Sequence, residues 1–264
     1  MSTSTQTGTP ARPLEGKVVV VTGGNSGIGE GIVRAAAAQG AKVVIDYVSR
    51  PEDTEAILAD IEAAGGEAVG CEADVSSVAD LQRLVDTAVR SFGRLDVMVN
   101  NAGVEFEETL ATLTEEKYDL LMGINLKGAV FGSQLAAAQM RRQGDGGVII
   151  NITSTHEDWP MPSDLAYCIS KGGMRMLTRT AGVELGPDGI RVVGVGPGAI
   201  RTAINAEDTP AETRALDAAI PLGRIGSPEE MGALVCFVAS DAAAYVTATT
   251  LMADGGLMQK PGAV

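Results

Sequence analysis

Three side chains with complementary proton chemistry lie within the stretch 151–173. Ser154 follows an apolar run, Tyr167 comes thirteen residues later and Lys171 four residues after that. Because positions i and i+4 of a helix share one face, we expect Tyr167 and Lys171 to point together toward Ser154. A phenol has a pKa of about 10, and a nearby ammonium group lowers it. These residues predict a site that moves a proton to or from an alcohol or carbonyl oxygen. The competing interpretation is an ordinary amphipathic helix, since Y-x-x-x-K also arises by chance.

A glycine-rich turn, T-G-G-N-S-G-I-G at 22–29, lies between a buried β-branched run and a helical stretch. A second buried run at 41–45 completes a β-α-β unit, which is the context of a dinucleotide-binding site. Gly23 would allow the tight turn, and Gly27 would let the backbone approach a pyrophosphate. Gly29 would let the helix pack closely on the sheet, with its N-terminus directed at the phosphates.

Strand and helix patterns alternate along the rest of the chain and indicate one α/β domain. Short apolar or β-branched runs indicate buried strands, and periodic stretches between them indicate helices. The expected strands are 17–21, 41–45, 67–73, 95–99, 148–152, 190–195 and 249–253. The expected helices include 52–64, 78–92, two stretches within 115–142 with Asn125 between them, 165–185 and one that begins after Ser227. This alternation predicts a single-domain, Rossmann-like, doubly wound parallel sheet of about seven strands over residues 14–264.

The composition excludes several classes of protein. The formal charge of −14 argues against a nucleic-acid or anionic-membrane surface, and no apolar run reaches the roughly 18 residues of a membrane span. Cys71, Cys168 and Cys236 form no C-x-x-C pair, which favours reduced thiols in a cytoplasmic protein without a metal site. Residues 1–13 are rich in Ser and Thr and lack signal-peptide features, so we expect a disordered tail there.

Several motifs, in one order and spacing, resemble the short-chain dehydrogenase/reductase family. They are the glycine-rich turn, N-N-A-G at 100–103, Asn125, Ser154, Y-C-I-S-K at 167–171, P-G-A-I-R-T at 197–202 and D-G-G at 254–256. The resemblance covers about residues 14–258. It implies a nicotinamide-dependent oxidoreductase that acts on the CH–OH group of a small-molecule substrate, usually as a homotetramer. S-T-H-E at 154–157, S-K-G-G-M at 170–174 and N-A-G-V-E at 101–105 are most similar to bacterial glucose dehydrogenases, whereas D-W-P-M-P-S-D at 158–164 departs from them.

The resemblance also implies roles for individual residues. Tyr167 would be the general acid or base, and Lys171 would lower its pKa and hold the nicotinamide ribose. Ser154 would bind the substrate oxygen, and Asn125 would hold a water of the proton relay. Besides Tyr167 and Lys171, the expected cofactor contacts are Gly23, Asn25, Ser26, Gly27, Ile28, Gly29, Tyr47, Val48, Ser49, Asp74, Val75, Asn101, Ala102, Gly103, Pro197, Gly198, Ile200 and Thr202. Residues 203–220 would form a lid that excludes water.

Glu105 and His156 are candidate substrate contacts beside Ser154 and Tyr167. Glu105 follows the fourth strand and could hydrogen-bond sugar hydroxyls. His156, the only histidine, lies just beyond Ser154 and would be at the pocket mouth. A solvated loop charge and a structural histidine are the alternatives. We expect a sugar or small polyol to be oxidised to its carbonyl or lactone. A 3-oxoacyl-carrier-protein reductase or general carbonyl reductase is the alternative, and a cofactor-binding protein without turnover would require a broken Ser, Tyr or Lys.

The end of the second strand, V-V-I-D-Y-V-S-R at 43–50, should decide between NAD and NADP. The position that is usually acidic in NAD enzymes falls on Tyr47, and the arginine position of NADP enzymes falls on Val48. Asp46 is one residue early and would face away from the ribose, because adjacent strand side chains point to opposite faces. Residues close enough in sequence to meet a 2′-phosphate are Asn25, Ser49 and Arg50. We therefore expect use of both cofactors with a slight preference for NADP, whereas a backbone shift that brought Asp46 to the ribose would make the enzyme strict for NAD.

Overall fold

The computed structural model describes residues 12–202 and 209–259, and one parallel sheet forms its centre. The strands are β1 (Val18–Val21), β2 (Lys42–Tyr47), β3 (Glu67–Glu72), β4 (Val97–Asn100), β5 (Gly147–Ile152), β6 (Ile190–Pro197) and β7 (Thr249–Ala253). They are ordered β3-β2-β1-β4-β5-β6-β7, and each neighbouring pair is parallel. The strand order reverses between β1 and β4, and ligands bind at the carboxyl ends of strands at such a switch point. The predicted Rossmann-like, doubly wound sheet is confirmed.

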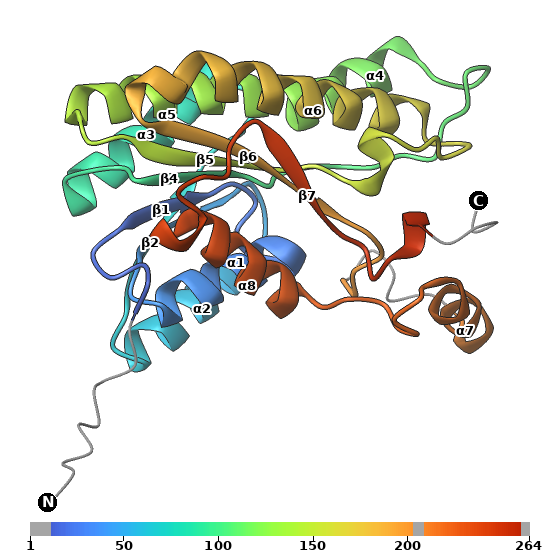
Figure 1. The fold of residues 1–264 in the computed structure, drawn as a ribbon, viewed down its shortest axis with the longest axis horizontal. Coiled ribbons are helices and arrows are strands. Elements are labelled where there is room, and N and C mark those ends of the chain that lie inside the picture. The colour runs from blue at the N-terminus through green and yellow to red at the C-terminus, as the bar shows by residue number, and fades with distance from the viewer. Residues whose placement is uncertain (1–11, 203–208, 260–264) are drawn as a thin grey trace, which may run out of the picture.

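Helices cover both faces of the sheet (Figure 1). One layer contains α3 (Val78–Phe92), α4 (Glu115–Met122), α5 (Gly128–Gln143) and α6 (Leu165–Leu185). The opposite layer contains α1 (Gly27–Ala38), α2 (Pro51–Ala63) and α8 (Pro228–Ala239), whereas α7 (Pro210–Ala219) lies apart from both layers. Because crossover helices bury both faces of a parallel sheet, its strands can be apolar throughout.

Alternate residues of each strand contribute to two separate hydrophobic cores, since successive side chains point to opposite faces. In β1, Val19 and Val21 belong to the core shared with α1 and α8. Val18 and Val20 belong to the core shared with α3 and α5. Such two-sided burial fixes the strand register, because a slip by one residue would exchange the two sets of side chains.

The start of α8, which the sequence placed after Ser227, is fixed by a capping box. The Ser227 hydroxyl accepts a hydrogen bond from the Glu230 amide at 3.4 Å, and the Glu230 carboxylate accepts one from the Ser227 amide at 2.9 Å. The two bonds satisfy backbone donors that a helix start leaves unpaired. The helix therefore begins at Pro228, directly after its cap.

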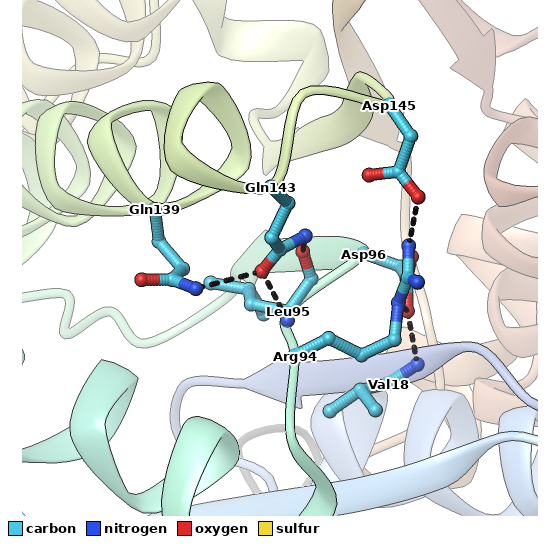
Figure 2. A network of polar contacts seen from close by, with 7 residues as sticks. All are labelled: Val18, Arg94, Leu95, Asp96, Gln139, Gln143 and Asp145. Carbon is cyan, nitrogen blue, oxygen red and sulfur yellow. Dashed lines mark hydrogen bonds and ion pairs between the residues drawn. The ribbon is translucent and has the colours of Figure 1, made fainter.

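A polar network fastens the amino ends of the strands, at the edge of the sheet opposite the switch point. Figure 2 shows it joining β1, β4 and the end of α5 through Val18, Arg94, Leu95, Asp96, Gln139, Gln143 and Asp145. Arg94 bridges Asp96 and Asp145 at 2.6 Å each. The buried Asp96 carboxylate accepts a hydrogen bond from the Val18 amide at 2.8 Å. The charged groups are thus satisfied by one another and by backbone, which a buried carboxylate requires.

The structure differs from the sequence prediction at several element ends. Strand β4 begins at Val97 and not at Leu95, because the Gln143 side chain bonds both the N–H and the C=O of Leu95. The two helical stretches predicted within 115–142, with Asn125 between them, agree with α4 and α5, and a π-helical turn at Gly123–Lys127 that contains Asn125 joins them. Of the expected tail at 1–13 and lid at 203–220, residues 1–11 and 203–208 lie outside the described part of the chain. Within 12–202 and 209–259, none of the helices combines the length and apolar character that crossing a membrane requires.

Candidate active site

The structure brings Ser154, Tyr167 and Lys171 together beside the carboxyl end of β5. Ser154 is buried directly after the strand and begins a short 3-10 turn, Thr155–Glu157. Tyr167 and Lys171 lie one turn apart on α6, and the Lys171 ammonium nitrogen lies 5.4 Å from the centre of the Tyr167 ring. The Lys171 Nζ donates a hydrogen bond to the Ile152 carbonyl of β5 at 2.9 Å. The three predicted proton-handling groups therefore share one buried region.

Burial controls the proton affinities of this group. It raises the pKa of Tyr167 to about 12, and the adjacent Ser154 hydroxyl opposes that change. It lowers the pKa of Lys171 to about 8, and the carboxylates of Glu105 and Glu157 oppose that change. The predicted lowering of the Tyr167 pKa is thus outweighed here, because removal from water destabilises the phenolate more than its neighbours stabilise it.

Asn125 connects the loop after β4 to α6 from within the π-helical turn. Its side chain is buried and pairs with both backbone groups of Val104, accepting from the N–H and donating to the C=O at 2.8 Å each. It also donates to the Ser170 hydroxyl at 3.4 Å. These bonds place the Val104 backbone next to the helix that carries Tyr167 and Lys171, and the water-holding role of Asn125 stays a prediction.

The glycine-rich turn forms a cradle in which side chains would not fit. Gly23 and Gly27 have φ angles of +58° and +52°, a region that favours glycine. A Cβ atom on Gly29 would overlap the Gly23 carbonyl oxygen and lie 2.7 Å from the Asn101 amide nitrogen. Gly29 therefore permits a close approach of the turn itself, where the sequence suggested packing on the sheet. Ser26, the N-cap of α1, makes no side-chain capping bond to the described residues, which leaves the helix N-terminus suited to a phosphate.

Hydrogen bonds join the loop after β4 to this turn. The Thr22 hydroxyl accepts hydrogen bonds from the amides of Asn101 and Ala102 at 2.8 and 2.9 Å. The Asn101 side-chain amide donates to the carbonyl oxygens of Thr22 and Gly23 at 2.8 and 3.1 Å. The two segments that border the switch point are therefore held as one unit, which fits the extended shape of a dinucleotide.

The remaining candidate cofactor residues follow the carboxyl ends of other strands. Asp74 and Val75 follow β3, Gly103 follows β4, and Gly198 follows β6. Thr202 approaches the turn, since a Cβ on Gly27 would lie 3.3 Å from its methyl carbon. The backbone of Ile200 pairs with Gly226. The structure thus distributes the predicted cofactor residues along the edge of the sheet where ligands bind in this architecture.

Asp46 and Tyr47 project to opposite sides of β2, as the strand period required. Asp46 is 2% exposed, and its Oδ2 accepts a hydrogen bond from the Gly23 amide at 3.0 Å. Its Oδ1 is buried and has no hydrogen-bond partner within the described residues, and burial raises the pKa of this carboxyl to about 7. Val48 is 69% exposed at the strand end. The Asn25 side-chain amide donates hydrogen bonds to the carbonyl oxygens of Ser49 and Arg50 at 2.8 and 3.2 Å. These bonds join the glycine-rich turn to the segment that follows β2.

The candidate substrate residues lie around Tyr167. The His156 ring centre is 6.4 Å from that of Tyr167, and the His156 Nδ1 is 3.1 Å from the Trp159 carbonyl oxygen. Glu105 lies on the partly buried loop after β4, close enough for its charge to affect the pKa values of both Tyr167 and Lys171. Removal from water raises the pKa of Glu105 itself, with a further contribution from Asp164.

Two buried carboxyl groups near the site were given no role by the sequence analysis. Glu157 and Asp164 are 7% and 5% exposed. Glu157 follows His156 directly in the sequence, but the sequence pattern around it does not indicate that its side chain is buried. Asp164 lies three residues before Tyr167, and burial raises its pKa as well. The signal that could have identified Asp164 is the run 158–164, which departs from the glucose-dehydrogenase pattern, whereas Glu157 belongs to S-T-H-E at 154–157, which follows that pattern.

Comparisons with known proteins agree with this geometry. A family model described as enoyl-(acyl carrier protein) reductase matches residues 23–258. The chain is 41% identical over 251 residues to 3β-hydroxysteroid dehydrogenase 1 of Eggerthella lenta, covering 94% of this chain and 96% of that protein. It is 36% identical over 252 residues to glucose 1-dehydrogenase 2 of Bacillus subtilis, covering 95% and 98%. A solved short-chain dehydrogenase/reductase of Serratia marcescens superposes with a TM-score of 0.87 at 36% identity, covering 93% and 99%.

Proposed function

Because this chain belongs to the short-chain dehydrogenase/reductase family, we propose that it interconverts a sugar or small polyol and its carbonyl or lactone, using NADP or NAD. The chain is an oxidoreductase that acts on CH–OH groups. The observation that carries the proposal is the position of Tyr167, flanked by Glu105 and His156, at the sheet edge that bears the glycine cradle. The test is a panel of sugars, polyols, 3-oxoacyl thioesters and steroid alcohols, each assayed with both cofactors.

Four residues of this chain would have separate roles in the reaction. Ser154 would donate a hydrogen bond to the substrate oxygen, and Tyr167 would accept the hydroxyl proton during oxidation and return it during reduction. Lys171 would hold the nicotinamide ribose and stabilise the phenolate. A bound nicotinamide supplies the acceptor or donor of the hydride. Asn125, through the Val104 backbone, would keep the loop after β4 against α6.

We expect Glu105 and His156 to set the preference for hydroxyl-rich substrates. A site whose polar groups pair with substrate hydroxyls discriminates strongly against substrates that lack them. Loss of one such bond typically costs about 1.5–3 kcal/mol when a charged group is involved, or about tenfold to a hundredfold. The expected result is a KM for sugars that rises by about that factor in Glu105→Ala and in His156→Ala, measured by steady-state kinetics.

The neighbouring exposed carboxylate offers a matched control for these variants. Glu107→Ala removes a charge two residues from Glu105 and should leave the KM for sugars unchanged. If Glu105→Ala and His156→Ala also leave the KM of every sugar unchanged, the preference for sugars is wrong. A 3-oxoacyl-carrier-protein or general carbonyl reductase then becomes the better assignment, although the formal charge of −14 disfavours docking of an acidic carrier.

The choice between NAD and NADP should depend on the residues at the end of β2, next to the glycine-rich turn. Asp46 is directed to the Gly23 amide, and the next two positions are an aromatic and an apolar side chain. We therefore expect both cofactors to be used, with a slight preference for NADP. Val48→Arg should raise kcat/KM for NADP relative to NAD by about tenfold to a hundredfold, because an arginine there can pair with a 2′-phosphate. A wild-type preference for NAD above about a hundredfold, about 2.7 kcal/mol, would show instead that Asp46 governs the ribose.

The proposal extends to a homotetramer in the cytoplasm. Ile169, Met176 and Val183 lie at intervals of seven residues on α6 and are 43%, 55% and 73% exposed. At another edge, Met252 of the terminal strand β7 is 42% exposed, and Tyr245 nearby in sequence is fully exposed. Large exposed apolar groups of this kind mark association surfaces, and two such surfaces are what a tetramer of identical chains uses.

A further inference from the structure

A chain of buried polar side chains crosses the sheet behind the candidate site, on the face that α5 and α6 cover. Its members are Ser133, Asn100, Asn151 and Thr178, and each is at most 4% exposed. Asn100 and Asn151 are register partners at the carboxyl ends of β4 and β5. The Asn100 amide nitrogen donates hydrogen bonds to the Ser133 hydroxyl of α5 at 3.0 Å and to the Asn151 amide oxygen at 2.8 Å. The Asn151 amide nitrogen donates in turn to the Thr178 hydroxyl of α6 at 2.9 Å.

The donors and acceptors of this chain match in one direction only. The Thr178 hydroxyl donates its proton to the Met174 carbonyl oxygen at 2.8 Å, so it meets Asn151 as an acceptor. The Asn151 oxygen accepts from Asn100, so the nitrogen of the same amide must face Thr178. Because hydrogen bonds require defined distances and angles, these contacts fix the helix more narrowly than the apolar contacts around them.

Thr178 lies on the face of α6 that carries Lys171. The two residues are seven positions apart, which is about two helical turns and about 10 Å along the helix axis. Met174 lies between them: its carbonyl oxygen accepts from the Thr178 hydroxyl, and its sulfur accepts from the Lys171 Nζ at 3.7 Å. A change in the seating of Thr178 is therefore transmitted along one helix face to Lys171.

Two side-chain hydrogen bonds attach this helix face to β5. One is the bond from Asn151 to Thr178, and the other runs from the Lys171 Nζ to the Ile152 carbonyl oxygen at 2.9 Å. Asn151 and Ile152 are adjacent, and Ser154 follows two residues later. The Lys171 bond involves a group that would also hold the nicotinamide ribose, whereas the Thr178 bond involves none of the proposed reacting groups.

We propose that Thr178 and Asn151 are positioning residues that set α6 against β5. Through this bond they keep Tyr167 and Lys171 in place beside Ser154. The inference rests on the proposed function, in which those three side chains handle the proton. An apolar pair would fill the same space without the cost of burying polar groups, but it would not direct the helix. The direction matters because a misplacement of about 1 Å can lower a rate by about a hundredfold.

The primary test is Thr178→Val, which keeps the shape of the side chain but removes the hydroxyl. We expect kcat with the best substrate of the panel to fall by about tenfold to a hundredfold. The Kd of the reduced cofactor should change less, because the glycine-rich turn is held by its own bonds to the loop after β4. Thr178→Ser keeps the hydroxyl and should restore kcat. Thr180→Val is the matched control, since Thr180 is exposed on the same helix, and it should leave kcat unchanged.

A double variant, Asn151→Leu with Thr178→Val, separates position from stability. Removing one partner leaves a buried donor unpaired, whereas replacing both partners by apolar groups can be nearly neutral for stability. Asn100 keeps Ser133 as an acceptor in this variant. We therefore expect the double variant to resist urea better than Thr178→Val, while its kcat stays low. A purely structural role predicts that kcat recovers together with stability.

Hydrogen exchange provides a readout that needs no substrate. Amides close to residue 178 will exchange faster after any loss of the hydroxyl, so the diagnostic amides are those of 166–171, two turns away. Their exchange should be faster in Thr178→Val, because α6 opens more often at its site end, and should match wild type in Thr178→Ser and Thr180→Val. All variants are compared at a temperature where they are folded.

The outcomes separate this inference from the proposed function. A wild-type kcat in folded Thr178→Val, a kcat that Thr178→Ser does not restore, or a kcat that recovers in the double variant overturns the inference. If Thr178→Val does not fold, the kcat of the double variant decides, and a wild-type value overturns the inference. If the wild-type protein turns over no member of the panel, the proposed function fails and exchange at 166–171 decides the inference: faster exchange in Thr178→Val supports it, and unchanged exchange overturns it.

Discussion

Replacing Tyr167 by phenylalanine is expected to remove nearly all turnover, by a factor of about 10²–10⁴, while cofactor binding stays close to wild type. The factor is the usual contribution of a positioned proton-transfer group. The phenyl ring keeps its packing beside His156 and Lys171, and only the hydroxyl is lost. The measurements are kcat with the best substrate of the panel and the Kd of the reduced cofactor by its fluorescence.

The control for this variant is Tyr118→Phe, which deletes a hydroxyl on α4 at a partly exposed position. It should change neither kcat nor cofactor affinity. A Tyr167→Phe enzyme with near-wild-type kcat would show that another group moves the proton, and His156 would be the first candidate. A large loss of cofactor affinity would show instead that the Tyr167 hydroxyl is mainly a cofactor contact.

The proton affinity of Tyr167 shapes the direction of its chemistry. With the pKa raised to about 12 by burial, the phenol is protonated at neutral pH, and in the proposed reaction it would donate to a carbonyl oxygen. Oxidation by the proposed route would need the phenolate, which neighbouring positive charge stabilises. Lys171 carries that charge mainly below its pKa of about 8, where the phenol is still protonated, so the charged lysine beside a neutral phenol would favour reduction.

The sequence could predict most of the fold because its signals are local. Valine-rich runs such as 18–21 indicate strands buried on both faces, and the observed strand lies there. The S-P-E-E start of α8 is likewise readable, because all groups of the capping box lie within four residues. By contrast, the start of β4 depends on Gln143, a residue 48 positions away from Leu95, and no local pattern reveals it.

Some features of the candidate site could likewise be predicted from local sequence, and others could not. The spacing of Tyr167 and Lys171 follows from helix geometry, and the alternation of Asp46 and Tyr47 follows from strand geometry. The setting of Glu157 does not, since its partner Thr250 is 93 residues away on β7. Nor could spacing foresee that burial would outweigh nearby charge at Tyr167, because desolvation depends on the packing of elements that are distant in sequence.

The close contacts within the glycine-rich turn predict that Gly29→Ala strongly weakens cofactor binding. The added methyl would overlap the Gly23 carbonyl oxygen, which is backbone and cannot rotate away, and would crowd the Asn101 amide. The turn would have to separate from the start of α1. That movement would weaken the Asn101 bonds to the Thr22 and Gly23 carbonyl oxygens. We expect the Kd of the cofactor to rise by about a hundredfold or more, which is about 2.7 kcal/mol.

The matched control is Gly186→Ala, where a Cβ would meet no described atom within 4 Å and the φ angle is not positive. Overpacking at Gly29 should also lower the free energy of unfolding by about 1–3 kcal/mol, whereas Gly186→Ala should leave it nearly unchanged. Urea unfolding and cofactor titration on both variants, at a temperature where both are folded, separate the two effects. A Gly29→Ala protein that is destabilised but keeps its cofactor affinity would mean that the turn shapes the fold without shaping the site. A loss of affinity beyond what the stability change explains would locate the phosphate-binding surface at the contact between Gly23, Gly29 and Asn101.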